Sequence, residues 1–402
     1  MTEIWAQASL WLGLALLASL LSIWLRIATA LSEIVIGTIA QLLIGAALGG
    51  ALLAGDATWV KFLSGAGAIL LTFLAGAELD PAVFRKQWKQ ATAIGLVSFA
   101  GPFIGCAAIA RWGMGWSTDA SWLAGIAMST TSVAVVYAVM LEFGFNTTHY
   151  GKVVLAACFI TDLATVVALG VIFAPFTWKT LVFLGAGAAA FVVLPWLTPR
   201  FFKRYGGRPS ELEAKFLMFT LFGLGALATW ADSEAVLPAY LLGMVLAGTV
   251  GKDHALIRRL RTLTFGLLTP FYFIRAGSLV SLPALVAAPL AFLALLAGKM
   301  FTKVAGVYPV TRAYKSPKGE GMYTTLLMST GLTFGTISSL FGLSHHLIDQ
   351  AQYSALVAAV IGSAVVPTLI ANAFFLPRHL LSRTEEVSLE GSSNAEKNTA
   401  RV

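Results

Sequence analysis

Hydrophobic residues along the chain gather into long, nearly uncharged runs, and charged residues or glycine, proline and asparagine separate one run from the next. A helix needs about 20 mainly apolar residues to cross a bilayer. Dividing the runs at these breaks predicts about thirteen transmembrane helices, at 4–25, 32–54, 60–79, 89–112, 119–142, 151–174, 178–198, 213–231, 235–250, 260–280, 283–309, 321–342 and 351–376. The pattern therefore predicts an all-α integral membrane protein.

Composition agrees with this prediction. Of the 402 residues, 58% are hydrophobic and 11% are charged, whereas an ordinary soluble domain has about 25% charged residues. The formal net charge of +8 comes without a basic face or a nucleic-acid-binding motif, so no nucleic-acid partner is expected. The predicted helices contain no cluster of histidine, glutamate and cysteine for a catalytic metal. We expect no cofactor and no enzymatic activity.

The distribution of lysine and arginine predicts the orientation. With the N-terminus outside and the C-terminus in the cytoplasm, 21 of the 27 basic residues fall in cytoplasmic segments, three fall outside and three lie within helices. This asymmetry is what the positive-inside rule requires. Residues 377–402 are rich in serine, glutamate and asparagine, which predicts a short disordered cytoplasmic tail after a transmembrane domain of residues 1–376.

Asp162 is the carboxylate that the pattern places at the middle of a predicted helix, the sixth. A charge at this depth is costly, so an ionisable residue there is a functional candidate. A carboxyl group in such a place can hold a proton or, when ionised, a dehydrated cation. The alternative is a purely structural partner for a lysine.

Three basic residues also lie within predicted helices. Lys299 falls toward the middle of the eleventh helix, and Lys303 follows one turn later on the same face. Arg275 lies near the outer end of the tenth helix. All three are candidates for balancing the charge of Asp162, although Lys303 and Arg275 could instead extend to the membrane surface.

Polar residues or glycines interrupt two predicted helices. The fifth contains Ser129, Thr130, Thr131 and Ser132, and the twelfth contains Thr330, Gly331 and Thr333. Such residues can simply join helices together. The two segments, however, are each fifth within a set of six helices, which is typical of an inverted-repeat transporter with two broken helices that cross near the midplane. The predicted repeats span about 4–174 and 213–376, with a linker helix at 178–198.

The order of these motifs resembles a known family. Gly76 to Pro81, Ser129 to Val133, the membrane Asp162 and Gly298-Lys299 follow one another as in the second branch of the monovalent cation:proton antiporters, which includes bacterial sodium/proton exchangers and potassium-efflux systems. The resemblance covers about residues 30–376. It implies alternating access in a homodimer of the bacterial inner membrane, in which a core bundle moves against a dimerisation bundle.

The resemblance also implies a role for each site residue. Asp162 binds Na+ or K+ and H+ in competition, with Thr161, Thr130 and Thr131 as further ligands. Many relatives carry a second aspartate, asparagine or glutamine where this chain has Thr161, and Arg-Gly-Glu where it has Gly331-Leu332-Thr333. A single membrane aspartate predicts electroneutral exchange. The alternatives are a sodium-coupled symporter of an organic anion and a channel.

Overall fold

The computed structural model describes residues 2–25, 29–48, 53, 55, 57–77, 81–145, 148–173, 177–231, 233, 235–287 and 289–380. Within these ranges all regular secondary structure is helical. The elements are α1 (Thr2–Leu25), α2 (Thr29–Leu48), α3 (Thr58–Ala77), α4 (Pro81–Ala108), η1 (Ile109–Gly113), α5 (Thr118–Ser129), α6 (Val133–Glu142), α7 (His149–Phe173), α8 (Trp178–Tyr205), α9 (Leu212–Trp230), α10 (Val236–Leu246), α11 (His254–Leu263), η3 (Thr264–Leu268), α12 (Thr269–Ser278), α13 (Leu282–Ala287), α14 (Pro289–Ala313), α15 (Lys318–Met328), α16 (Thr333–Ser344), α17 (Gln350–Ile370), η4 (Ala371–Phe375) and η5 (Arg378–Leu380).

Helices lie on every stretch that the hydrophobic pattern predicts to cross the membrane. Nine helical segments of the described ranges are long and apolar enough to span a bilayer. The all-α membrane fold is thus confirmed, whereas thirteen crossings and the division into repeats stay predictions. Residues 78–80, part of the Gly76 to Pro81 motif, and residues 381–402 of the predicted tail lie outside the described residues.

One predicted helix, 260–280, contains a π-helical turn in the structure. It consists of α11, a π-helical turn (η3) and α12. Pro270, in the first turn of α12, has no backbone N–H to donate, so the hydrogen-bond pattern of a regular α-helix is interrupted there. The π-helical turn lies directly before this missing donor, and the helical backbone continues through it.

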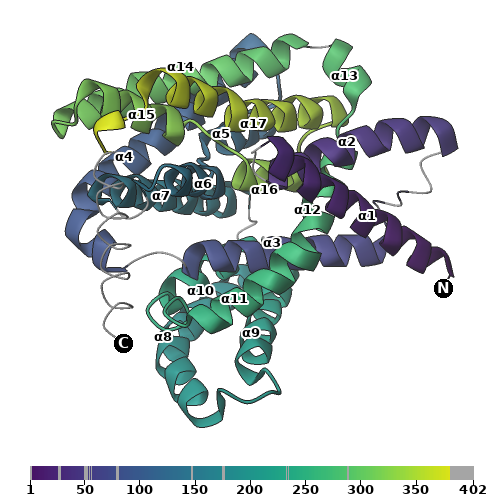
Figure 1. The fold of residues 1–402 in the computed structure, drawn as a ribbon. Helices are drawn as coiled ribbons and strands as arrows, with labels where there is room; N and C mark the ends of the chain where they lie inside the picture. Colours follow the sequence, from purple (N-terminus) through teal and green to yellow (C-terminus); the bar gives the residue numbers. More distant parts are fainter. Residues whose placement is uncertain are drawn as a thin grey trace, which may run out of the picture.

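The helices form two bundles (Figure 1). In one, α4 packs against α5, α7 and α14, while α16 and α17 complete the group together with α6 and α15. In the other, α2 and α3 pack against α12, α3 packs against α10, and α8 and α9 lie beside one another. We call these the α4–α14 bundle and the α3–α10 bundle.

Glycines bring α4 and α14 close together. The two helices run antiparallel, since Val97 lies at Gly306 whereas Ile109 lies at Gly298. A Cβ atom on Gly105 would come within 2.4 Å of the Thr302 side chain. Small residues permit such close approach between helices in a membrane protein. This packing places α14, with its two lysines, against the polar face of α4.

The two broken helices meet at their breaks. The segment between α5 and α6 is residues 130–132, and the one between α15 and α16 includes residues 330–332. Thr130 has an extended backbone, with φ −61° and ψ 154°, so α5 ends before this residue. The backbone N–H of Ser132 donates to the carbonyl of Thr330 at 3.1 Å. One backbone hydrogen bond therefore joins the two interruptions directly.

Candidate functional site

Asp162 lies on α7 beside the two breaks. Its side chain is 1% exposed. The backbone N–H of Thr131 hydrogen-bonds to the carboxylate, whereas Oδ1 has no hydrogen-bond partner among the described residues. A buried polar atom without a partner is costly and therefore requires an explanation, such as a functional role or a bound ion or water. The geometry leaves Oδ1 available to a proton or a cation.

Two buried lysines act electrostatically on this carboxylate. Lys299 and Lys303 are both 0% exposed and both interact with Asp162 through space. Lys303 Nζ donates to Ser98 Oγ at 2.6 Å, to the Ser129 carbonyl at 3.0 Å and to Thr131 Oγ1 at 3.1 Å. Lys303 therefore does not extend to the membrane surface, the alternative that the sequence left open.

Lys299 lies one turn away, at the other break. Its Nζ donates to Ser363 Oγ on α17 at 3.1 Å. Gly331 faces this ammonium so closely that a Cβ atom there would lie 2.2 Å from Nζ. The two lysines thus reach one break each, Lys303 at residues 129–131 and Lys299 at residue 331.

The predicted threonine ligands all surround the same region but donate their protons to the protein. Thr131 Oγ1 donates to the Met328 carbonyl at 2.8 Å, and Thr130 Oγ1 donates to the Ala127 carbonyl at 3.1 Å. Thr161 Oγ1 donates to the carbonyls of Gly95 and Ala157, both at 3.1 Å. These bonds orient the hydroxyl oxygens, whose lone pairs can still accept a hydrogen bond or contact a cation.

The remaining predicted residues shape the breaks. Ser129 Oγ donates to the Ile126 carbonyl at 2.7 Å, and Thr330 Oγ1 donates to the Leu327 carbonyl at 2.7 Å. Ser132 Oγ accepts from the Val135 N–H at 3.3 Å, which satisfies a donor in the first turn of α6. Thr333 is the first residue of α16. Ser129, Ser132 and Thr330 thus stabilise helix ends at the two breaks.

Arg275 does not join this cluster. It is buried on α12, and its Nε donates to the Gly55 carbonyl at 2.9 Å. It also lies close enough to Tyr353 for an electrostatic interaction. Since α12 packs against α2 and α3 whereas Tyr353 is on α17, this guanidinium lies where the α3–α10 bundle meets the α4–α14 bundle. The structure therefore gives no support to its assignment as a partner of Asp162.

Four buried polar side chains were missed by the sequence prediction. Ser98 and Ser363 accept from the two lysines. Tyr240 on α10 interacts electrostatically with Asp162 and donates from its hydroxyl to the Phe159 carbonyl at 3.1 Å. Glu33, near the start of α2, is 3% exposed. An acidic residue inside a hydrophobic run is a signal that could have revealed Glu33, whereas single serines in membrane helices usually only join helices.

The chemistry of the cluster suits a small cation or a proton. The described residues contain no group of three or more histidine, cysteine, aspartate or glutamate side chains that could bind a divalent metal. One carboxylate, several oriented oxygens and the backbone carbonyls of two broken helices are hard ligands of low total charge. Both lysines lie close enough to act electrostatically on a charged Asp162.

The chain is similar in sequence to known cation transport proteins. The glutathione-regulated potassium-efflux system protein KefC of Enterobacter sp. (strain 638) is 27% identical over 97% of this chain, which spans 62% of that relative's length. The probable Na(+)/H(+) antiporter 3 of Methanocaldococcus jannaschii is 26% identical, with 54% of this chain and 58% of that protein aligned.

A solved structure shows the same fold. The sodium proton antiporter MjNhaP1 from Methanocaldococcus jannaschii, determined at pH 8, superimposes with a TM-score of 0.67 at 15% identity, covering 92% of this chain and 96% of that one. Residues 12–376 match the family described as sodium/hydrogen exchanger, transmembrane. This match extends over most of the chain and includes Asp162, both lysines and both breaks. The chain belongs to the transmembrane sodium/hydrogen exchanger family.

Proposed function

We propose that this protein exchanges a monovalent cation, Na+ or K+, for H+ by alternating access, with Asp162 as the shared binding group. The observation that carries the proposal is the buried Asp162 carboxylate, whose Oδ1 has no partner among the described residues, at the meeting point of two broken helices. The activities for which these relatives are named, sodium/proton antiport and potassium efflux, support the same reaction class. The relatives described above give no support to an organic-anion symporter.

Competition for one carboxylate couples the two ions. A proton on Asp162 removes the charge that a dehydrated cation needs, and a bound cation excludes the proton. The oxygens of Thr130, Thr131 and Thr161 complete the cation's surroundings. Lys299 and Lys303 stabilise the charged carboxylate while one ion replaces the other, and only the cation-bound or the protonated form crosses between the two access states.

The two bundles supply the moving parts in this proposal. The α4–α14 bundle contains Asp162 and both lysines, and it moves against the α3–α10 bundle to open the site to one side at a time. We infer a homodimer that is held together by the α3–α10 bundle. The membrane is a bacterial inner membrane, with the N-terminus outside and the C-terminus in the cytoplasm.

The selectivity of the site is tested with purified protein in vesicles. Proton release from the vesicle lumen is followed as Li+, Na+, K+ or Rb+ is added outside in turn. Na+ or K+ should give the largest proton flux at equal concentration. If none of the four cations caused proton flux, the proposed exchange would be contradicted. Uptake of a labelled carboxylate driven by sodium would instead support symport.

The Asp162→Asn variant tests the assignment of the binding group. The amide has nearly the same shape but neither releases a proton nor offers a charge to a cation, so exchange should fall below detection while the protein still folds. The matched control is Glu33→Gln, which neutralises another buried carboxyl group on α2. Cation-dependent proton flux that persists in Asp162→Asn would place the binding group elsewhere.

A further inference from the structure

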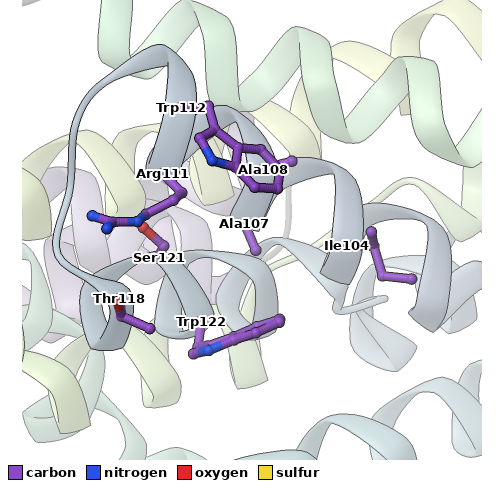
Figure 2. A pocket seen from close by; sticks show the side chains of 8 residues that line it. All are labelled: Ile104, Ala107, Ala108, Arg111, Trp112, Thr118, Ser121 and Trp122. Atoms are coloured by element: carbon purple, nitrogen blue, oxygen red, sulfur yellow. The ribbon is translucent and has the colours of Figure 1, made fainter.

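A groove on the surface of the protein lies at the end of α4, between η1 and α5 (Figure 2). It shares no lining residue with the Asp162 site and has a cavity volume of about 160 Å³. Its lining is mainly apolar and consists of Ile104, Ala107, Ala108, Arg111, Trp112, Thr118, Ser121 and Trp122. The proposed exchange uses none of these residues.

The groove has a polar end and an apolar end. Figure 2 shows Arg111 at one end and Ile104 at the other, with the rings of Trp112 and Trp122 on opposite sides of the two alanines. The side chain of Trp112 is 83% exposed and that of Ile104 is 63% exposed, so both face away from the protein interior. On an apolar membrane span, an exposed side chain of this kind faces lipid.

The position of Arg111 along the span places it at the depth of lipid headgroups. It lies two residues before the end of the apolar segment Trp88–Gly113. Tryptophan and arginine are typical of this boundary, where an amphipathic side chain contacts both hydrocarbon and water. The apolar end of the groove, toward Ile104, extends about two turns deeper along α4.

The guanidinium of Arg111 is held in place by a hydrogen bond but retains further N–H donors for a ligand. Its Nη1 donates to the Trp116 carbonyl at 2.9 Å, its one hydrogen bond among the described residues. A guanidinium has five N–H donors in a planar fork, which matches the oxygens of a phosphate. Asp119 is the neighbouring acidic residue on α5, but it is exposed and does not line the groove.

We propose that this groove binds a phospholipid, with an acyl chain along Ala107 and Ala108 and the phosphate at Arg111. A soluble phosphate would use only the arginine and would leave the apolar length unexplained. A protein segment from a second copy would not require a phosphate-binding group at the membrane boundary. The combination of one phosphate-binding group and an adjoining apolar channel at that depth fits a membrane phospholipid.

The test measures phospholipid that stays bound to the intact protein in detergent. Wild-type protein is titrated with phosphatidylglycerol and, separately, with diacylglycerol of the same acyl chains, and bound lipid is counted by native mass spectrometry. We expect specific retention of phosphatidylglycerol. Arg111→Gln should weaken its apparent affinity by about three- to tenfold, the effect of one charge-assisted contact at a partly solvated site.

Arg200→Gln is the matched control. Arg200 is exposed, donates from Nη1 to the Trp196 carbonyl at 2.7 Å and does not line the groove. Its replacement should leave the retention of phosphatidylglycerol unchanged. Ile104→Ser, at an exposed position, should weaken the binding of both phosphatidylglycerol and diacylglycerol. Equal retention by wild type and Arg111→Gln, equal binding of diacylglycerol and phosphatidylglycerol by wild type, or no retained lipid at all would each overturn the proposal.

Discussion

Gly331 makes room for the Lys299 ammonium. A Cβ atom at this position would lie 2.2 Å from Lys299 Nζ and 3.1 Å from Ser363 Oγ. The flexible lysine can yield, so Gly331→Ala should fold, but the hydrogen bond between Lys299 and Ser363 should be lost. Since such a charged hydrogen bond contributes about 1.5–3 kcal/mol, we expect exchange to slow by about tenfold or more. Proton flux in vesicles measures this rate.

A second glycine provides the control for that substitution. Gly185 lies within α8, and nothing lies within 4 Å of the Cβ atom that alanine would add. Gly185→Ala should preserve exchange and raise stability by up to about 1 kcal/mol, because alanine favours a helix over glycine. If Gly331→Ala exchanged at the wild-type rate, the placement of the Lys299 ammonium would not matter for transport.

The sequence predicted some of these residues but not their contacts. Asp162 could be predicted because a carboxylate in the middle of an apolar helix is costly unless it has a function. Ser98 and Ser363 could not, because a serine in a membrane helix has the same sequence signal whether it accepts from a lysine or packs against a neighbour. Only the packing of α4 and α17 beside α14 distinguishes the two roles.

Thr131 connects the break in one helix to the end of another. Its Oγ1 donates to the Met328 carbonyl of α15 and accepts from Lys303. Thr131→Val keeps the shape and removes both contacts, so we expect a loss of about 1–2 kcal/mol in the free energy of unfolding. The half-saturating cation concentration should also rise more than the maximal rate falls, because the hydroxyl oxygen is a proposed ligand. Thermal unfolding and exchange assays measure the two effects.

Thr220→Val separates this effect from the general loss of a hydroxyl group. Thr220 Oγ1 donates only within its own helix, to the Phe216 carbonyl of α9 at 2.9 Å. The control should change neither the cation affinity nor the stability appreciably. An unchanged cation affinity in Thr131→Val would mean that the hydroxyl only joins the two helices.

Helices were the part of the fold that the sequence predicted best. Long apolar runs leave little choice in a bilayer, because only a helix satisfies every backbone group internally. The breaks at 130–132 and 330–332 were also predictable, since polar residues and Gly331 interrupt otherwise apolar segments. The π-helical turn within 260–280 was not predicted, because hydrophobicity alone does not distinguish such a turn from a regular α-helix.

The arrangement of the whole molecule depends on contacts between distant segments. The sequence analysis expected a core bundle and a second bundle only through the resemblance to a family. The packing of α4 against α14 depends on glycines 101, 105 and 298, whose partners lie about 200 residues away along the chain. No local pattern identifies such partners, which is why the position of Lys303 beside Ser98 and Thr131 could not be predicted.

The charge carried in one complete cycle is a property of the whole molecule. Asp162 is the carboxyl group at the crossing of the broken helices, and Thr161 occupies the position where many relatives have another ionisable or amide side chain. If Lys299 and Lys303 keep their protons, one H+ leaves for each monovalent cation that binds. Each half-cycle then carries the same net charge, and the membrane potential does no net work on the exchange. We therefore predict electroneutral exchange.

Tight vesicles at clamped potentials test this prediction. The cation gradient reached at equilibrium should be the same at every potential, although one transported charge would be worth about 2.3 kcal/mol per 100 mV. A gradient that shifts with voltage would contradict the one-for-one count and indicate a second proton carrier. The variant Lys299→Gln would then test whether Lys299 is that carrier, because removing the true carrier restores voltage-independent exchange, whereas the control variant Glu33→Gln should not. Lys299 is the first candidate, since its single described hydrogen bond, to Ser363, leaves its ammonium less strongly held than that of Lys303 with its three acceptors.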